Sequence, residues 1–374
     1  MPNVRYRFQL NESCTLSLDD LDGYESNATL RAKLCPERRL LMTDTQSHSQ
    51  AARSHPPLEA CYLTGPTASG KTPLALQIAT RLDAEIISLD SMAIYRGMDI
   101  GTAKPTAADR ERVKHHMLDV VDPNENYSVS CYVEATHRIA AEIQQRGKRV
   151  LFVGGTPLYL KSLLRGSFVG PPANIEFRQA VEADVAEYGL ESLRERLMQV
   201  DPLLAHKLHP HDERRMTRAL EVAMTTGRPL SHWQTQFETP ANSPRIRAAV
   251  ISLDRAWLHE RINTRVEQML ALGLEEEVRQ LKARYGTLSS TAAQAVGYRE
   301  LLSAIAGSLI ERTGVDREQT VDEIKAHTRQ FARRQEIWFR GLKELERFEL
   351  TPETPLEQLA DRITAWYKVG YNLG

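Results

Sequence analysis

Eight consecutive residues have the types and the spacing of a phosphate-binding loop, or P-loop. Residues 65–72 read GPTASGKT and match the pattern GxxxxGK followed by Ser or Thr at every fixed position. The two glycines allow backbone angles that point successive N–H groups at an anion, and the lysine adds a positive charge. The final hydroxyl can ligate Mg²⁺. The residues that we expect to bind phosphate are Gly65, Pro66, Thr67, Ala68, Ser69, Gly70, Lys71 and Thr72.

One carboxylate stands where it could act beside those phosphates. Asp90 directly follows the apolar run EIISL, whereas the run at 149–153 ends in GGT without an acid. Motor and switch NTPases need an acid after a distant strand to hold Mg²⁺ and water. Small-molecule kinases instead have an acid near the phosphates that can take a proton from an acceptor. The residues therefore favour group transfer from a phosphorylated donor to an acceptor near Asp90. An ordinary helix N-cap at Asp90 is equally compatible with the spacing.

The elements around these residues predict an α/β fold. Short apolar runs alternate with helical periods, as in strands that are buried on both faces of a parallel sheet. The predicted strands are 60–64, 85–89, 117–121, 149–153 and 245–252. Crossover helices between them predict a doubly wound sheet whose ligands lie at the carboxyl ends of the strands. Residues 174–235 have helical periods and no convincing strand, and we expect only helices after 252.

Composition limits the class of protein. The chain has 374 residues, a net charge of −1 and a hydrophobic share of 41%, as in an ordinary globular protein. Its four cysteines form no CxxC pair, which favours reduced thiols over a zinc site or disulfides. No window has the apolar length of a membrane span, and residues 1–57 lack a signal core. We expect a cytoplasmic protein, with a poorly ordered extension at 1–57 and no feature that demands a dimer.

Several long motifs resemble one known family. They are GPTASGKT, DSMAIYRGMDIGTAKP (90–105), GGTPLY (154–159), HPHDERRMTRALE (209–221), AVGYRE (295–300) and TRQFARRQEIWFRG (328–341). In this order, over about residues 60–345, they closely resemble the bacterial tRNA dimethylallyltransferases, also called isopentenyl-tRNA transferases. The organisation that we expect is a P-loop NTPase-like core at 58–173 and 238–345, a helical insertion domain at 174–237 that contacts the anticodon loop, and a helical tail at 346–374.

The resemblance implies a reaction and a role for each matching residue. A dimethylallyl group would pass from dimethylallyl diphosphate to N6 of adenosine 37, in tRNAs that read codons beginning with U. The P-loop would hold the diphosphate with Mg²⁺, with Thr72 as metal ligand. Asp90 would be the general base, and Lys71 and Thr156 would complete the catalytic set. The implied contacts with the tRNA anticodon stem-loop are Asp90, Ser91, Met92, Ala93, Thr156, Arg178, Arg214, Arg215, Met216, Thr217, Arg218, Gln294, Ala295, Val296, Gly297, Tyr298 and Arg299.

Basic residues near the carboxyl end fit RNA binding on their own chemistry. Six Lys or Arg and one acid, Glu336, lie between Lys325 and Lys343, interleaved with Phe331, Trp338 and Phe339. Such a helix could contact phosphates and stack on bases, or it could be a solvated helix with its aromatic residues in the core. Arg261 and Arg265, one helical turn apart, could reach the diphosphate or form structural ion pairs.

Three other functions share part of the pattern. A small-molecule or nucleotide kinase would use the P-loop and Asp90, but it has no use for the 174–235 insertion or the basic helix. In a prenyltransferase acting on free adenylate, the tRNA-binding segments should be shortened or missing. In this chain those segments are present. A nucleotide-driven RNA-binding switch requires an acidic Mg²⁺ ligand after a distant strand, and the 149–153 run offers none.

Overall fold

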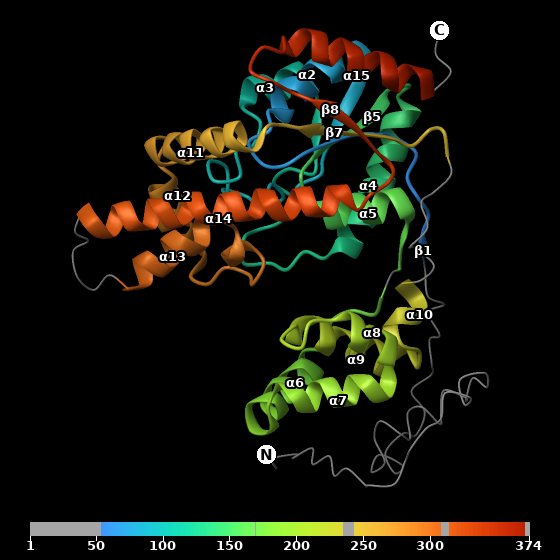
Figure 1. The fold of residues 1–374 in the computed structure, drawn as a ribbon, viewed down its shortest axis with the longest axis vertical. Coiled ribbons are helices and arrows are strands. Elements are labelled where there is room, and N and C mark those ends of the chain that lie inside the picture. Colours follow the sequence, from blue (N-terminus) through green and yellow to red (C-terminus); the bar gives the residue numbers. More distant parts are fainter. Residues whose placement is uncertain (1–53, 169, 235–242, 308–313, 371–374) are drawn as a thin grey trace. The chain divides into compact units, whose positions relative to one another are not determined.

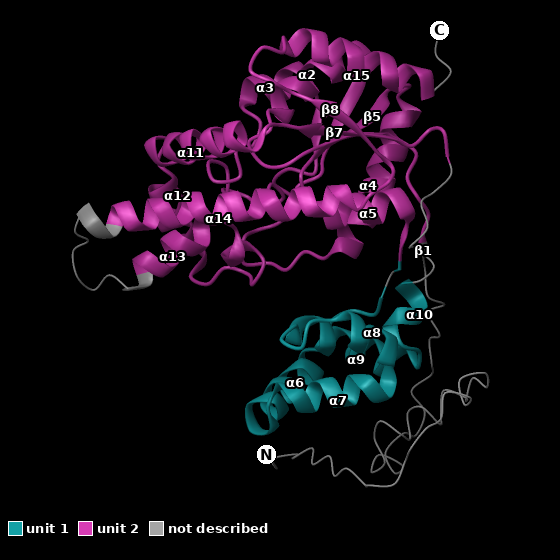
Figure 2. Ribbon diagram, viewed as in Figure 1, with its two compact units in different colours: residues 1–54, 168–238 teal, residues 55–167, 239–374 magenta. Residues whose placement is uncertain are grey.

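The structure, a computed structural model, describes residues 54–168, 170–234, 243–307 and 314–370. The chain divides into two compact units (Figure 2), which we call the sheet unit (residues 55–167 and 239–374) and the helical unit (residues 168–238, with the residues up to Ser54). The expected extension at 1–57 lies almost entirely outside the described residues, as does the expected domain boundary at 237–238.

A sheet of six parallel strands forms the centre of the sheet unit. Its strands, in the order β4-β3-β5-β2-β7-β8 across the sheet, are β4 (His115–His116), β3 (Ala84–Ser88), β5 (Arg149–Gly154), β2 (Cys61–Thr64), β7 (Arg247–Ser252) and β8 (Leu345–Glu349). The chain leaves β2 toward one edge of the sheet and later returns to its other side at β7. In open parallel sheets this reversal marks the ligand site, at the carboxyl ends of the strands. The predicted parallel α/β sheet is confirmed.

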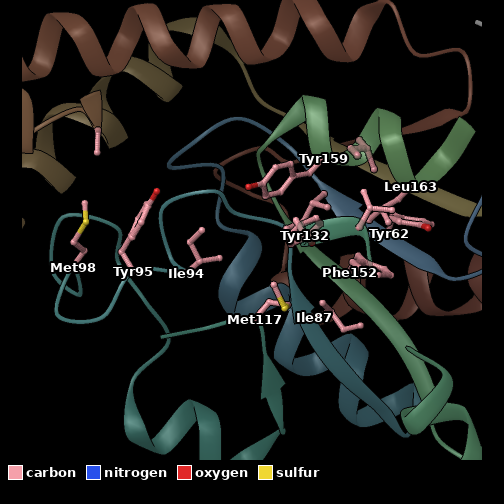
Figure 3. Packing of buried hydrophobic residues seen from close by; sticks show 14 of the residues in the cluster. Tyr62, Ile87, Ile94, Tyr95, Met98, Met117, Tyr132, Phe152, Tyr159 and Leu163 are labelled. Carbon is pink, nitrogen blue, oxygen red and sulfur yellow. The ribbon is translucent and has the colours of Figure 1, made fainter. Parts of the chain in front are cut away.

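Both faces of the sheet are buried. Tyr62 and Phe152 point into one apolar layer (Figure 3), and Leu63 and Leu151 point into the other. This alternation with burial on both sides explains why the strands read as continuous apolar runs. Among the helices that contribute to the first layer are α4 (Val129–Gln145) and α5 (Pro157–Arg165), and those that contribute to the second include α2 (Lys71–Leu82) and α15 (Leu356–Gly370).

A group of helices follows β7 and reaches the P-loop. They are α11 (Arg255–Ala271), α12 (Leu274–Tyr285), the 3₁₀ turn η3 (Ala292–Gln294), α13 (Tyr298–Gly307) and the long α14 (Gly314–Arg340). The helix α14 runs beside α11 (Figure 1). Ala332 of α14 packs with Leu258 and Ile262 of α11 and with Ala68 of the P-loop. The small side chains at 68 and 332 allow α14 to come close to the loop.

One predicted strand was wrongly placed. We expected it at 117–121, but the strand is β4, and α3 (Ala107–Arg112) precedes it. Met117 and Asp119 have positive φ angles of 59° and 56°, so the chain leaves the extended conformation directly after β4. Val121 makes only an isolated bridge with Tyr95. The apolar character of this run has another cause, because the Met117 side chain is buried in the core under a loop.

The prediction of helices alone after residue 252 was also wrong. Strand β8 pairs in parallel with β7 and forms an edge of the sheet, so the expected helical tail at 346–374 begins inside a strand. Its sequence, LERFE, is mostly charged, and only Phe348 is buried. An edge strand exposed to water has no need of an apolar run, and charges on it disfavour pairing with other chains. The helix α15 then covers the sheet, as a helical tail would.

The helical unit has its own core. Its helices are α6 (Ile175–Tyr188), α7 (Leu190–Val200), α8 (Pro202–Lys207), α9 (Glu213–Thr226) and α10 (Leu230–Gln234). Val181, Leu193, Leu197 and Leu220 pack together inside it. Within residues 170–234 the structure has helices and no strand, as predicted. Two short strands elsewhere, β1 (Ser54–His55) and β6 (Ser167–Phe168), pair with each other. None of the helices in the described ranges combines the length and the hydropathy of a membrane span.

Candidate active site

The P-loop connects the end of β2 to the start of α2, as the sequence predicted. Gly70 precedes α2 with a φ of 82°, in the left-handed region that favours glycine. A side chain at Gly65 would put its Cβ 2.9 Å from both the Ile251 carbonyl oxygen and the Ser69 hydroxyl. Both glycines are therefore required by the local backbone. The helix α2 has no acid in its first turn, so its positive N-terminal end faces the loop without a competing carboxylate.

Lys71 folds back over the loop. Its Nζ donates to the carbonyl oxygens of Gly65 and Pro66, at 2.9 and 2.6 Å, and lies 3.2 Å from the Ser69 hydroxyl. Burial, with a contribution from the nearby Arg265 guanidinium, lowers the pKa of Lys71 from 10.5 to about 7, and Asp90 opposes that change. A concentration of positive charge that is costly in the free protein is suited to an anionic ligand.

Two arginines of α11 complete this positive site. Asp254 caps the helix by accepting from the N–H groups of Ala256 and Trp257. Arg261 donates from Nε to the Ala68 carbonyl oxygen at 2.8 Å, with its guanidinium 5.0 Å from the Trp257 ring centre. Burial lowers the pKa of Arg265, against the raising effect of Asp90. Across the described residues neither arginine makes an ion pair, and their contact with a diphosphate stays a prediction.

Asp90 lies two residues after the end of β3. In the sheet, β5 lies between β3 and β2, the strand that leads into the P-loop. Its Oδ1 accepts from the N–H groups of Met92 and Ala93, at 2.8 and 3.3 Å. No helix begins there, so Asp90 caps a turn and the helix N-cap alternative does not hold. Its charge acts on Lys71 and on Arg265, which places the carboxylate within electrostatic reach of the phosphate site. The parallel topology therefore puts Asp90 and Lys71 at the same edge of the sheet, and the role of Asp90 as a base stays a prediction.

Thr156 links the ends of β3 and β5. It is the N-cap residue of α5 but makes no capping bond; instead its Oγ1 accepts from the Ser91 N–H at 3.0 Å. Its own N–H donates to the Leu89 carbonyl oxygen at 3.2 Å. A Cβ at Gly154 would lie 2.2 Å from that same oxygen, so only glycine permits this approach. Thr156 thus holds the chain on both sides of Asp90.

The later residues of the 90–105 motif hold the loop after Asp90 to the neighbouring structure. The Lys104 side chain, only 2% exposed, is paired with Asp99 at 2.6 Å and with Asp119 at 2.5 Å. Glu277 of α12 accepts from the N–H groups of Asp99 and Ile100, at 2.9 and 2.8 Å. These contacts fix the loop that follows Asp90. Of the contact residues predicted there, Ser91 and Met92 are half-buried and Ala93 is buried.

The predicted contact segment 294–299 is similarly divided. Tyr298 is fully buried and its hydroxyl donates to Glu277 at 2.5 Å, and Ala295 and Gly297 are also buried. Arg299 donates to Glu300 at 2.6 Å. Gln294 is exposed and Val296 is half-buried. The structure therefore gives solvent access mainly to the two ends of this segment, while its centre packs against α12.

In the helical unit the predicted contacts also separate into two groups. Arg178 and Arg218 both bind the buried Glu221, at 2.9 and 2.5 Å. Although burial raises the pKa of Glu221, the hydrogen bonds from these two arginines outweigh it and lower the pKa. Arg214 and Arg215 are exposed on α9, Thr217 is half-buried, and Met216 is in the core of the unit. Arg214 and Arg215 are thus the exposed cationic surface of this segment, and Arg215 is paired with Asp212 at 3.4 Å.

Two aromatic residues of α14 lie in different surroundings, and contact of this helix with RNA stays a prediction. Phe339 is 2% exposed and belongs to the core, whereas Trp338 is 40% exposed. Arg333 and Arg334 are exposed beside it. Gln335, for which the sequence pattern predicts no role, lies between these groups and turns inward. Its Oε1 accepts from the Thr67 N–H at 2.9 Å and its Nε2 donates to the Gly155 carbonyl oxygen at 2.6 Å.

A Mg²⁺ ion would be held here chiefly by the phosphate oxygens of a bound diphosphate. Within the described ranges no cluster of three or more His, Cys, Asp or Glu side chains could bind a metal ion. Thr72 is exposed at the first turn of α2, next to the P-loop. Mg²⁺ commonly keeps its waters and binds phosphate oxygens with few protein ligands. The Thr72 hydroxyl beside a phosphate site fits that pattern.

The chain is similar to proteins of one family. The family model described as IPP transferase matches residues 93–342. A tRNA dimethylallyltransferase of Rhodopirellula baltica is 49% identical over 295 residues, covering 77% of this chain and 86% of that protein. The crystal structure of a tRNA isopentenylpyrophosphate transferase from Bacillus halodurans aligns with a TM-score of 0.58 at 33% identity, covering 84% of this chain and 98% of that one. A eukaryotic dimethylallyltransferase acting on tRNA shares the fold, with a TM-score of 0.70 at 24% identity over 85% and 80% of the two chains.

Proposed function

The chain belongs to the IPP transferase family, and from that premise we propose that it transfers a dimethylallyl group from dimethylallyl diphosphate to an adenosine of tRNA. One observation carries the proposal: a strongly cationic phosphate site and a carboxylate lie within electrostatic reach of each other. A donor's leaving diphosphate fits the first, and an acceptor's amine fits the second. The reaction forms a bond from N6 to the allylic carbon and breaks the bond from that carbon to the diphosphate oxygen.

The donor's diphosphate binds in the P-loop. Backbone N–H groups at the start of α2, the Lys71 ammonium and the guanidinium groups of Arg261 and Arg265 surround it with positive charge. Thr72 would help to hold Mg²⁺, which supplies further positive charge to the diphosphate. These groups stabilise the negative charge that develops as diphosphate leaves, which is usually the largest electrostatic contribution to such a reaction.

Asp90 acts as the general base. The N6 lone pair of adenine is delocalised into the ring, so the amine becomes a better nucleophile as its proton is taken. Oδ1 of Asp90 is occupied by two backbone N–H groups. Its orientation is therefore fixed, while the carboxylate as a whole can still accept the proton. Thr156 is near the same centre through Ser91, and we assign it to the contact with the target nucleotide.

The acceptor is adenosine 37, beside the anticodon, in tRNAs that read codons beginning with U. To reach Asp90 its base must leave the stack, so we infer that the enzyme flips it out. The exposed basic residues Arg214 and Arg215 contact the anticodon stem-loop, together with Arg333 and Arg334. The enzyme acts as a monomer in the cytoplasm, where its tRNA substrate is found.

Incubation with dimethylallyl diphosphate, Mg²⁺ and unmodified tRNA tests the proposal. Nucleosides from the digested tRNA should gain the mass of a dimethylallyl group on adenosine, with one diphosphate released per transfer. The variant Asp90→Asn removes a carboxylate from the site, and Glu111→Gln, at an exposed position of α3, is the control for the loss of one negative charge. Asp90→Asn should abolish transfer while tRNA binding persists. Transfer to free adenylate, or ATP turnover without prenylated tRNA, would replace the proposal by one of its two enzymatic alternatives.

A further inference from the structure

The side-chain amide of Gln335 joins two loops that are far apart in the sequence. Its Oε1 accepts from the N–H of Thr67 in the P-loop, 268 residues away, at 2.9 Å. Its Nε2 donates to the carbonyl oxygen of Gly155, 180 residues away, at 2.6 Å. Gln335 is only 3% exposed. Both ends of a buried amide are therefore satisfied by backbone groups, one from each loop.

The surroundings of Gln335 are shaped to this contact. A Cβ on Gly155 would lie 2.5 Å from Nε2 of Gln335 and 3.1 Å from the Gly65 carbonyl oxygen. One turn earlier on α14, Ala332 packs on Ala68 of the P-loop. The small residues at 155, 332 and 68 let the helix and both loops approach until one amide spans them.

The two loops carry the two halves of the reaction. The P-loop holds Lys71, and the 154–156 loop holds Thr156, whose hydroxyl accepts from Ser91 beside Asp90. A displacement of one loop against the other changes the distance between the leaving group and the base. In-line transfer is sensitive to such changes, and misplacement by about 1 Å can cost a hundredfold in rate.

Resting on the function proposed above, we propose that Gln335 is a positioning residue that sets the spacing between the donor loop and the acceptor loop. It contacts neither the reacting atoms nor the diphosphate in this role. Only an amide suits the position, because it offers one acceptor and one donor at the distance required. A carboxylate would keep the bond to Thr67 but could not donate to Gly155.

Replacement of Gln335 by Met, of similar length, removes both bonds and keeps the apolar packing. The matched control is Gln330→Met, on the exposed face of the same helix. With saturating dimethylallyl diphosphate and tRNA, the single-turnover rate of Gln335→Met should fall about ten- to hundredfold. The tRNA Kd should stay within about twofold of wild type, and Gln330→Met should match wild type in both measurements.

Either of two outcomes of these measurements would overturn the proposal. A normal single-turnover rate at saturation, with only a lowered Tm, would make Gln335 part of the core and nothing more. A loss confined to the tRNA Kd would make it a contact with RNA. If the wild-type protein prenylates no tRNA, the proposed function is wrong instead. The bridge is then tested by hydrogen exchange, which requires no activity. Amide hydrogen exchange should be faster in Gln335→Met at both 65–72 and 154–157, and loosening of only one loop would contradict a bridge.

A second pair of variants tests the contact itself. Gly155→Ala should reduce the transfer rate, because the new methyl group meets the Gln335 amide. In a Gln335→Ala background that space is open, so the same substitution should cost several-fold less than it does in wild type. Non-additivity of this kind identifies residues that act through one contact. Additive losses would show that Gly155 and Gln335 act independently and would overturn the proposal.

Discussion

The Thr156 hydroxyl accepts a hydrogen bond from the Ser91 N–H at 3.0 Å, which ties the end of β5 to the residue after Asp90. The helix cap that Thr156 could have made is given up for this contact. The bond therefore contributes to the geometry around Asp90, the proposed base, more than to the stability of α5. A side chain that serves position rather than helix stability should show its effect in the rate.

Thr156→Val removes the hydroxyl and keeps the shape of the side chain. We expect the single-turnover rate of transfer to fall about tenfold or more, since the Ser91 N–H loses its partner and Asp90 is less firmly held. Thr156→Ser, which keeps the hydroxyl, should recover most of the rate. Equal activity of the Val and Ser variants would show that the hydroxyl has no part in positioning the base.

Lys71 predicts how donor binding depends on pH. Its pKa is lowered to about 7 in the free protein, mainly by burial. If the protonated form binds the diphosphate, as proposed, affinity for Mg²⁺–diphosphate should be level below about pH 7 and decrease as pH rises above it. Arginine stays charged over this range, and Lys71→Arg should lack this contribution.

Calorimetry of diphosphate binding between pH 6 and pH 9 would measure both proteins. The ligand's own titration is common to the two, so the ratio of their affinities isolates the lysine. A ratio that does not change with pH would mean that Lys71 remains protonated throughout.

The P-loop and its partner could be predicted because each depends on local rules. A strand, a glycine pattern and a helix start are all encoded within residues 60–82, and the parallel topology then places Asp90 beside them. Gln335 could not be predicted in this way. Its contacts span 180 and 268 residues, and a glutamine between an arginine and a glutamate has no periodicity that distinguishes an inward from an outward side chain.

Two errors in the secondary structure have a common physical origin. Apolar character reports burial rather than strand geometry: Met117 is buried, and Val120 and Val121 are partly buried against the same core, without forming a strand. The charged β8 is a strand because its edge position needs only one buried residue, Phe348. Met216 and Tyr298 were implied as contacts with tRNA, but both side chains are buried. Motif resemblance names a segment, but only packing decides which of its side chains face the solvent.

The buried Glu85 predicts a loss of stability in acid. It accepts from Arg146 at 2.7 Å and lies 2.6 Å from Nε2 of His116. Although burial raises the pKa of Glu85, the hydrogen bonds from Arg146 and His116 outweigh it and lower the pKa from 4.5 to about 2. A depressed pKa means that the stabilisation is complete above about pH 4.5 and is lost as pH falls toward 2.

Replacement of Glu85 by Gln should therefore lower the free energy of unfolding at pH 7 by about 2 kcal/mol or more, because Arg146 and His116 lose their partner. It should also flatten the decline of stability between pH 4.5 and 2. Urea unfolding at several pH values would measure both effects. Asp83→Asn, which breaks an exposed pair with Lys148, is the control and should cost less than about 1 kcal/mol. Parallel pH curves for wild type and Glu85→Gln would contradict the assignment.

The exposed pair Arg333 and Arg334 predicts the salt dependence of tRNA binding. If each neutralises one phosphate, replacing both by Ala releases two fewer counterions, and the slope of log K against log salt concentration should become shallower by about 1.4 to 1.8. Affinity at low salt should fall. The rate at saturating tRNA should change little, because both side chains are exposed and neither is assigned a part in the transfer step. Arg347→Ala with Arg362→Ala removes the same charge from exposed positions on β8 and α15 and should leave the slope unchanged. Equal slopes for the two double variants would show that α14 attracts RNA only through the net charge of the protein.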